Sequence, residues 1–285
     1  MHVIVMGDAL LDIDRISLER AGGRIGRRVE YVESLDSTNA EAWRRIEHAD
    51  ADGLVVFAEH QTAGRGRLGR TWEAPRGAGL LMSVVVFDQP VGQDCVANDS
   101  ATGARLGVAI AVATCDAIAR TAGVTVVIKW PNDLLIGGRK VAGILIESRK
   151  LSDARVAYVI GIGINCLQHR GHLIGPLAKT ATSLEIESEF AIDRTALAVE
   201  VLRHLEEWVL PVPAVNVDRL RAAWMQRCEP MGRRVHLLHG GKAYAGSMID
   251  IDPGAGLVVQ LDEGGVRAFS ALETTVLPSP TTVDE

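Results

Sequence analysis

The stretch Gly64-Arg65-Gly66-Arg67-Leu68-Gly69-Arg70 interleaves glycines with arginines. An arginine offers a planar fork of donors that fits carboxylate and phosphate oxygens. A glycine lets the backbone approach a ligand closely and adopt turns that other residues avoid. This segment, which we call the arginine loop, is therefore predicted to wrap an anionic small molecule and hold its charge in place.

Other interpretations of the arginine loop have to be weighed. It could be a solvated basic loop, or an arm that binds nucleic-acid phosphates without sequence preference. Gly64, Gly66 and Gly69 also satisfy the dinucleotide fingerprint G-x-G-x-x-G, which requires a helix directly after the loop. Residues 71–79 include a proline and further glycines and do not predict a helix, so the dinucleotide interpretation fails.

Length, charge and cysteine content limit the class of protein. With 285 residues, 47% of them apolar, the chain can form one large domain or a main domain with a small appendage. Its net charge of −6 disfavours a broad nucleic-acid-binding surface, because the positive charge of the arginine loop is local. The four cysteines are scattered without a C-x-x-C pair, which indicates neither a metal site nor a disulfide framework. No signal peptide is recognisable and no apolar run approaches the ~18 residues of a membrane span, so we expect a cytoplasmic protein without membrane association.

The pattern of apolar residues predicts an α+β fold with a mixed sheet. Thr38 to Glu41 matches a capping box, in which Thr38 caps a helix that carries Trp43, Ile46 and Ala49 on one face. Further helices are expected at 13–18, at 102–122 (ended by Gly123), from Asp193 as cap to about 210, and at 217–227. Strands are expected at 29–32, 53–58, 80–87, 124–130, 134–136, 139–147 and 156–164.

The chain changes character near Cys228. Short strands are expected at 234–238, 242–250, 257–261 and 266–270, separated by turns that contain glycine. Such regular hairpin spacing predicts a small β-barrel. We therefore expect an N-terminal extension at 1–29, a main body at 30–227 and an all-β tail at 228–285.

A second basic cluster lies on the hairpin expected at 134–147. Lys129 and Asp133 precede it, and Lys140 follows its two-glycine turn. Taken alone, Lys129 is a common strand-edge residue and Asp133 a common turn residue. Together with the arginine loop, they indicate a site for several negative charges, such as a nucleoside triphosphate and a carboxylic acid. An aspartate can then hold Mg²⁺ among the phosphates.

Several motifs occur in an order that resembles one known family. They are Ser37-Thr38-Asn39 with Gln61, the arginine loop, Lys129-Trp130-Pro131-Asn132-Asp133, Arg139-Lys140-Val141-Ala142-Gly143-Ile144-Leu145 and Gly161-Ile162-Gly163-Ile164-Asn165. Together they resemble the biotin–protein ligases, also called biotin–[acetyl-CoA-carboxylase] ligases or holocarboxylase synthetases. The resemblance implies a body related to the catalytic fold of class II aminoacyl-tRNA synthetases and an SH3-like barrel. It also implies the single-function type, because residues 1–29 are too short for the DNA-reading domain of bifunctional relatives.

The resemblance implies a reaction in two steps. ATP and biotin give biotinyl-5′-AMP and pyrophosphate, and a lysine of the biotin carboxyl carrier protein of acetyl-CoA carboxylase then displaces AMP to form an amide. Attack of a carboxylate on an α-phosphate brings like charges together, and at ~4 Å each such pair repels by several kcal/mol in a partly dry site. Arginines and lysines can offset this repulsion without a nucleophilic side chain.

The resemblance also implies roles for individual residues. Those expected to bind biotin are Ser37, Thr38, Asn39, Gln61, Gly64, Arg65, Gly66, Arg67, Lys140, Gly143, Gly161 and Gly163. Those expected to bind ATP are Arg67, Arg70, Trp72, Lys129 and Asn165. Arg67 and Lys140 are expected to be catalytic through their charge, and Asp133 to hold Mg²⁺. Structural roles stay open for Thr38 as a helix cap, for Trp72 as a core residue and for the glycines as relief of crowding between strands.

Two other functions stay open. A lipoate– or octanoate–protein ligase shares the fold and the adenylate chemistry, but has a different arginine- and glycine-rich signature. A non-enzymatic RNA-binding module could use the arginine loop and the barrel. The resemblance further implies the carrier protein as partner and no specific DNA binding, and it leaves a homodimer open. Leu68 stands where many relatives have a basic or polar residue.

Overall fold

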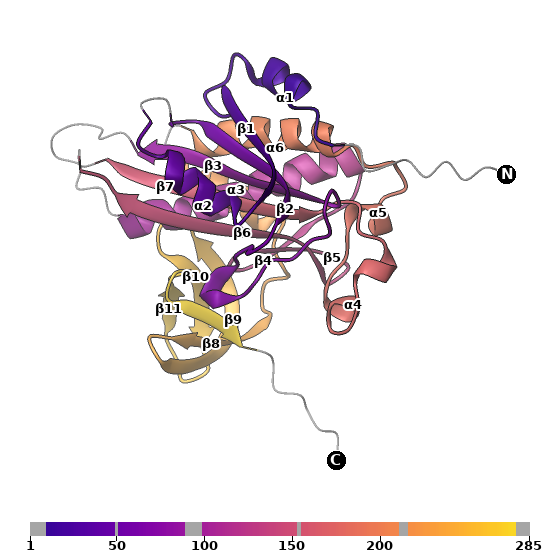
Figure 1. Cartoon of the computed structure of the whole chain (residues 1–285). Helices are drawn as coiled ribbons and strands as arrows, with labels where there is room; N and C mark the ends of the chain where they lie inside the picture. The colour runs from indigo at the N-terminus through magenta and orange to yellow at the C-terminus, as the bar shows by residue number, and fades with distance from the viewer. Residues whose placement is uncertain (1–9, 49–50, 89–98, 153–154, 211–215, 278–285) are drawn as a thin grey trace.

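The computed structural model describes residues 10–48, 51–88, 99–152, 155–210 and 216–277. Within these residues a seven-stranded sheet forms the centre of the body. The tail forms a five-stranded sheet, which lies below the body in Figure 1. The predicted α+β fold is confirmed.

The main sheet is mixed, as predicted. Its order is β1 (Arg28–Leu35), β2 (Leu54–Gln61), β3 (Gly79–Asp88), β7 (Val156–Asn165), β6 (Arg139–Lys150), β5 (Asp133–Ile136) and β4 (Val127–Lys129). β1 and β2 run parallel, and each other neighbouring pair is antiparallel. Each predicted strand of the body is present, although β4 is shorter than predicted and β6 is longer.

Helices cover both faces of the main sheet (Figure 1). α3 (Asp99–Ala122) and α6 (Arg194–Val209) pack together over the face that carries Phe57. α2 (Thr38–Arg45) packs over the other face, which carries Val56. Side chains alternate between the two faces of a strand, so consecutive residues of β2 belong to different cores.

α3 forms from the apolar run expected at 102–122, and Gly123 ends it with a φ of 66°. Its segment Ala101–Ala122 is the one helix in the described ranges that is long and apolar enough to cross a membrane, judged by length and composition. However, 67% of that segment's apolar window is buried inside the protein, which is typical of a core helix. α1 (Ile13–Arg20) packs on α6, and α7 (Val217–Met225) packs on α3.

The tail forms a second, antiparallel sheet. Its order is β11 (Val266–Phe269), β10 (Gly256–Leu261), β9 (Lys242–Asp252), β8 (Arg234–His239) and β12 (Thr274–Leu277). The sequence does not predict β12, because no glycine-containing turn precedes it. No ladder joins β11 to β12 in the described part of the tail, so the expected closed barrel is not observed. The tail is bonded to β4, where the amide of Glu229 donates to the Ile128 carbonyl at 3.1 Å.

Some details correct the prediction. α2 begins at Thr38, so its N-cap is Ser37, and no side-chain hydrogen bond from a described residue caps it. The hydroxyl of Thr38 contacts Gln61 instead. Short helices that the sequence does not predict, α4 (Leu177–Thr180) and α5 (Leu184–Glu187), follow β7. Ala49, predicted on the apolar face of α2, and Cys95 lie outside the described residues, as does most of the predicted loop at 88–100.

Candidate active site

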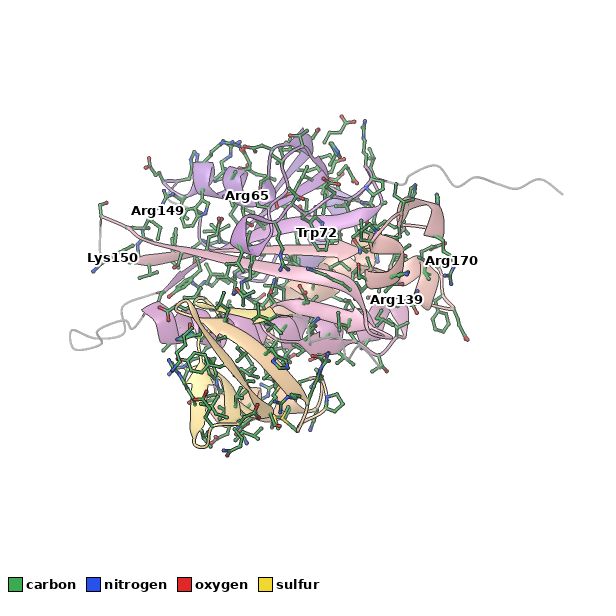
Figure 2. The ribbon with its side chains drawn as sticks, turned by 90° about the horizontal axis from the view of Figure 1, so that it is seen from below. Arg65, Trp72, Arg139, Arg149, Lys150 and Arg170 are labelled. Carbon is green, nitrogen blue, oxygen red and sulfur yellow. The ribbon has the colours of Figure 1, made fainter. Side chains whose placement is uncertain are left out.

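A cavity of about 380 Å³ lies where the start of α2, the arginine loop, the β5–β6 hairpin, β7 and β12 meet. Figure 2 shows Arg65 and Trp72 over the middle of the main sheet, with Arg149 toward one end and Arg139 toward the other. Most residues that the sequence assigns to a site line this one cavity: Ser37, Thr38, Asn39, Gln61, Arg65, Gly66, Arg67, Arg70, Trp72, Lys129, Asp133, Lys140, Gly143, Gly161 and Gly163.

Glycines open the face of the sheet at this cavity. Gly143 on β6 pairs with Gly163 on β7, and Gly161 lies on the same face of β7. A Cβ at Gly163 would lie 2.6 Å from the Trp72 ring, and one at Gly161 would lie 2.3 Å from Oδ1 of Asn39. Trp72 and Asn39 therefore take up the space directly above the glycines.

One end of the cavity is lined by uncharged polar groups. Oε1 of Gln61 accepts hydrogen bonds from the amide of Thr38 at 2.8 Å and from its hydroxyl at 3.1 Å. Oγ of Ser83 lies 2.8 Å from that hydroxyl and donates to Oδ1 of Asn39 at 2.6 Å. No motif singles out the buried Ser83, although its place opposite Gly161 in the β3–β7 ladder is a signal once the register is known. This end suits a small, uncharged ring with donors and acceptors.

Glu147 on β6 accepts from two side chains of α2 and one of the arginine loop. Its carboxylate accepts from Nδ2 of Asn39 and Nε1 of Trp43, each at 3.0 Å, and from Arg65 at 3.2 Å. Sequence reasoning missed Glu147, because it lies just beyond the hairpin motif. Arg65, whose side chain is 45% exposed, is thereby held against the sheet.

Backbone bonds shape the arginine loop. The amide of Trp72 donates to the carbonyl of Gly64 at 3.0 Å. A Cβ at Gly64 would lie 2.2 Å from the Trp72 carbonyl oxygen, so this position requires glycine for the fold. Gly64 itself does not line the cavity. Leu68 adopts a φ of 56° in the single turn η1 (Arg67–Gly69) and is 62% exposed.

Arg67 joins the arginine loop to the tail. Its guanidinium donates to Oδ1 of Asn132 and to the carbonyl of Thr274, each at 3.2 Å, and also to the carbonyl of Ala271. Burial lowers the pKa of Arg67 from its usual value, while the charge of nearby Asp133 opposes that shift. The sequence does not predict this contact, because no pattern links two segments so distant in the chain.

The other end of the cavity is cationic. Arg70, Lys129 and Lys140 line it together with Arg67. Nζ of Lys140 lies 2.6 Å from a carboxylate oxygen of Asp133 and 5.3 Å from the centre of the Trp72 ring. Nε1 of Trp72 is buried and has no hydrogen-bond partner among the described residues. Because buried donors usually have a partner, this indole faces a place for a ligand acceptor.

The cavity has one acidic group that can contribute to a magnesium site, in which substrate phosphates supply most of the ligands. Asp133 is the one carboxylate that lines the cavity in the described ranges. The same ranges contain no cluster of three or more His, Cys, Asp or Glu side chains that could hold a metal by itself. Mg²⁺ commonly takes one or two carboxylates and completes its shell with substrate phosphates and water, a pattern that Asp133 can serve.

Asn165 lies beside the cavity rather than in its lining. Its Nδ2 donates to the carbonyl of Thr182 at 2.9 Å, and its Oδ1 accepts from Gln168 at 3.0 Å. The amide of Thr182 in turn donates to the carbonyl of Lys140. Asn165 thus holds the segment that supports Lys140, and its expected contact with adenine stays a prediction.

Comparisons with known proteins identify the family. Residues 31–165 match the Biotin/lipoate A/B protein ligase family. The chain is 37% identical over 246 residues to the biotin–[acetyl-CoA-carboxylase] ligase of Mycobacterium tuberculosis, which covers 84% of this chain and 85% of that protein. It is 29% identical over 248 residues to the bifunctional ligase/repressor BirA of Bacillus subtilis, covering 87% of this chain and 74% of that protein. Its fold is similar to that of the biotin protein ligase from Aquifex aeolicus in complex with biotin and ATP, with a TM-score of 0.72. The two sequences are 23% identical, and the match covers 89% of this chain and 100% of the other. The chain belongs to the biotin protein ligases of the biotin/lipoate A/B protein ligase family.

Proposed function

We propose that this protein joins biotin to a lysine of a biotin carboxyl carrier protein, using ATP and forming biotinyl-5′-AMP on the way. The polarity of the cavity carries the proposal: one end has uncharged hydrogen-bonding groups and the other has cations. Such a cavity suits a ligand with an uncharged polar ring and a carboxylate that must meet a nucleoside triphosphate. The names of the mycobacterial relative and of the Aquifex aeolicus complex support this pairing of ligands.

The ureido ring of biotin binds at the uncharged end. Ser37, Thr38, Asn39 and Gln61 lie there and supply donors and acceptors for the ring. The valeryl chain then follows Gly161 and Gly163 toward the cationic end, where the carboxylate meets Lys140. Arg65 and Gly66 close the cavity from the side of the arginine loop.

The first step joins two anions. A carboxylate oxygen of biotin attacks the α-phosphorus of ATP, the bond from that phosphorus to the bridging oxygen breaks, and pyrophosphate leaves with the electron pair. Arg67, Arg70, Lys129 and Lys140 offset the repulsion between the carboxylate and the phosphates, and Trp72 offers its ring to the adenine. These groups lower the barrier by position and charge alone.

Asp133 would hold Mg²⁺ together with the phosphates of ATP, and the ion would supply charge that neutralises those phosphates. Asp133 also pairs with Nζ of Lys140 at 2.6 Å and so holds this lysine at the cationic end of the cavity.

The second step transfers biotin to the carrier. The amine of the carrier lysine attacks the carbonyl carbon of the mixed anhydride, the bond from that carbon to the phosphate oxygen breaks, and AMP leaves with the electron pair. The amine loses a proton to solvent, and an amide remains. The mixed anhydride reacts with water if released, so retention by the arginine loop is part of the function.

The alternative is a lipoate– or octanoate–protein ligase, which the family description includes. The uncharged polar groups favour biotin, because an octanoyl chain has no donors or acceptors to pair with them. Exchange of labelled pyrophosphate into ATP tests this choice. We expect exchange with biotin and none with octanoate or lipoate, and octanoate-dependent exchange alone would overturn the proposal.

Further properties belong to the same proposal. The tail sheet is SH3-like, the body spans 30–227 with the tail at 228–285, and the enzyme works in the cytoplasm without binding DNA or membranes. Its association into a homodimer is open to measurement by sedimentation. An RNA-binding module would instead show RNA affinity that falls steeply with salt, together with no pyrophosphate exchange.

A further inference from the structure

We propose that Glu147 fixes the orientation of the Asn39 side-chain amide, and so makes the uncharged end of the cavity select a ligand that donates from a ring N–H. Glu147 is a positioning residue in this scheme, because it acts through Asn39. The inference rests on the proposed function, since it concerns how the ureido ring of biotin is recognised.

The surroundings of Asn39 allow one orientation of its amide. On one side lie the carboxylate of Glu147, at 3.0 Å, and the carbonyl of Leu145, at 3.5 Å. A carboxylate and a carbonyl can only accept hydrogen bonds. The NH₂ group of Asn39 must therefore face Glu147, because the opposite orientation would set oxygen against oxygen.

The other side of the amide faces the cavity with its oxygen. Oδ1 of Asn39 accepts from Oγ of Ser83 at 2.6 Å and lies over Gly161, a residue of the cavity lining, within 2.3 Å of where a Cβ would be. A carbonyl oxygen has two lone pairs, so one remains for a ligand after Ser83 has used the other. Asn39 is 3% exposed and lines the cavity, so a donor that reaches this lone pair comes from the bound ligand.

Gln61 is oriented in the opposite sense. Its Oε1 accepts from the backbone amide of Thr38 at 2.8 Å, and a backbone amide can only donate. The NH₂ group of Gln61 is thereby left to donate to the ligand. An acceptor at Asn39 and a donor at Gln61 match a ureido ring, which offers N–H groups and a carbonyl oxygen.

Replacing Glu147 by alanine removes the acceptor, so the Asn39 amide can turn over and present its NH₂ group to the cavity. Replacing it by glutamine keeps an acceptor in place, because Trp43 and Arg65 can only donate and hold the glutamine oxygen where the carboxylate oxygen was. The ion pair with Arg65 is lost at the same time, which weakens binding of biotin and of its analogues alike.

The experiment measures dissociation constants by calorimetry for biotin and for two analogues, each with one ureido N–H replaced by oxygen. In the wild type, the analogue that sets its oxygen against Asn39 should bind about 100-fold more weakly than biotin. In E147A this ratio should fall by at least about fivefold, whereas E147Q, which keeps an acceptor for Asn39, should retain it. The matched control is E41Q, because Glu41 pairs with Arg44 and Arg45 on the same helix, away from the cavity. E41Q should keep the wild-type ratio.

The outcomes separate the inference from the function. If the wild type binds biotin and discriminates against one analogue, but folded E147A keeps the wild-type ratio, or E147Q loses it as E147A does, the acceptor at 147 does not set the selectivity. If the wild type binds biotin and both analogues equally, Asn39 is not the acceptor and the inference also fails. Absence of biotin binding by the wild type would instead refute the proposed function.

Discussion

Lys140 lies between a carboxylate and an aromatic ring, and its charge is the part that the chemistry needs. Replacing it by methionine keeps the apolar stem over Trp72 but removes the cation that faces the carboxylate and phosphate. We expect kcat of biotin-dependent pyrophosphate exchange to fall about 10²–10³-fold in K140M, the usual effect of removing one such group. K150M, a change of an exposed lysine on the same strand, should leave the exchange rate unaltered. Equal rates in both variants would show that Lys140 has no catalytic role.

A substitution at Gly163 tests how closely the Trp72 ring packs on β7. A methyl group there would meet the indole ring at 2.6 Å and displace it, at the cost of overpacking. The KM for ATP should rise about tenfold in G163A, because a shift of the ring costs at least about 1 kcal/mol of stacking. G103A is a suitable control, since nothing lies within 4 Å of the added Cβ on α3. An unchanged KM for ATP in G163A would argue against adenine binding by Trp72.

At the scale of elements, local patterns were predictable and long-range contacts were not. The apolar run of α3 with Gly123 behind it, and the two-glycine turn between β5 and β6, are fixed by neighbours in the sequence. In contrast, the hydroxyl of Thr38 does not cap the helix as predicted. It contacts Gln61, and this contact depends on how α2 packs on β2. Glu147 and Ser83 became visible as site residues only once the register of three strands was known.

Asp193 is a predicted cap that the structure confirms, and it links two elements. Its carboxylate accepts from the amide of Ala196 at 2.9 Å at the start of α6 and pairs with Arg15 of α1 at 2.8 Å. Partial burial acts to raise the pKa of Asp193, but these two bonds outweigh it and hold the pKa below its usual value. The carboxylate therefore stabilises the fold above the unfolded-state pKa of about 3.9, and this contribution is lost as the pH falls through the lower folded-state value.

D193A should thus lower the free energy of unfolding by about 1 kcal/mol at neutral pH. The difference from the wild type should shrink as the pH falls below about 4, because both chains then lack the charged cap. Urea titrations at several pH values measure it, with E189A as an exposed carboxylate control. A difference that stays constant down to the lowest pH would contradict the role of the charge.

At the scale of the whole molecule, the site is completed by the tail. β12 contributes Thr275, Val276 and Leu277 to the lining of a cavity whose other walls come from the body. The motifs in the sequence indicated the ligands and the body. The contribution of the tail depends instead on docking between distant segments, since Arg67 and Thr274 are 207 residues apart in the chain. No periodicity in the sequence encodes such a contact.

Arg67 is the residue through which the arginine loop contacts the tail. In R67A the carbonyls of Ala271 and Thr274 lose their donor, and a buried acceptor left without a partner costs about 1–3 kcal/mol. For a chain of this size each kcal/mol lowers Tm by about 2–4 °C, so a fall of several degrees is expected. The rate of amide hydrogen exchange should rise in both 64–72 and 271–277, because each segment loses its contact with the other. Free biotinyl-AMP should also accumulate in solution, because the loosened loop no longer retains it. R76A alters another arginine of the β2–β3 connection, one that pairs with Glu33, and it should change none of these three quantities. If R67A retained the adenylate and kept wild-type exchange in the tail, the loop and the tail would have to be regarded as independent, and closure of the site would depend on the body alone.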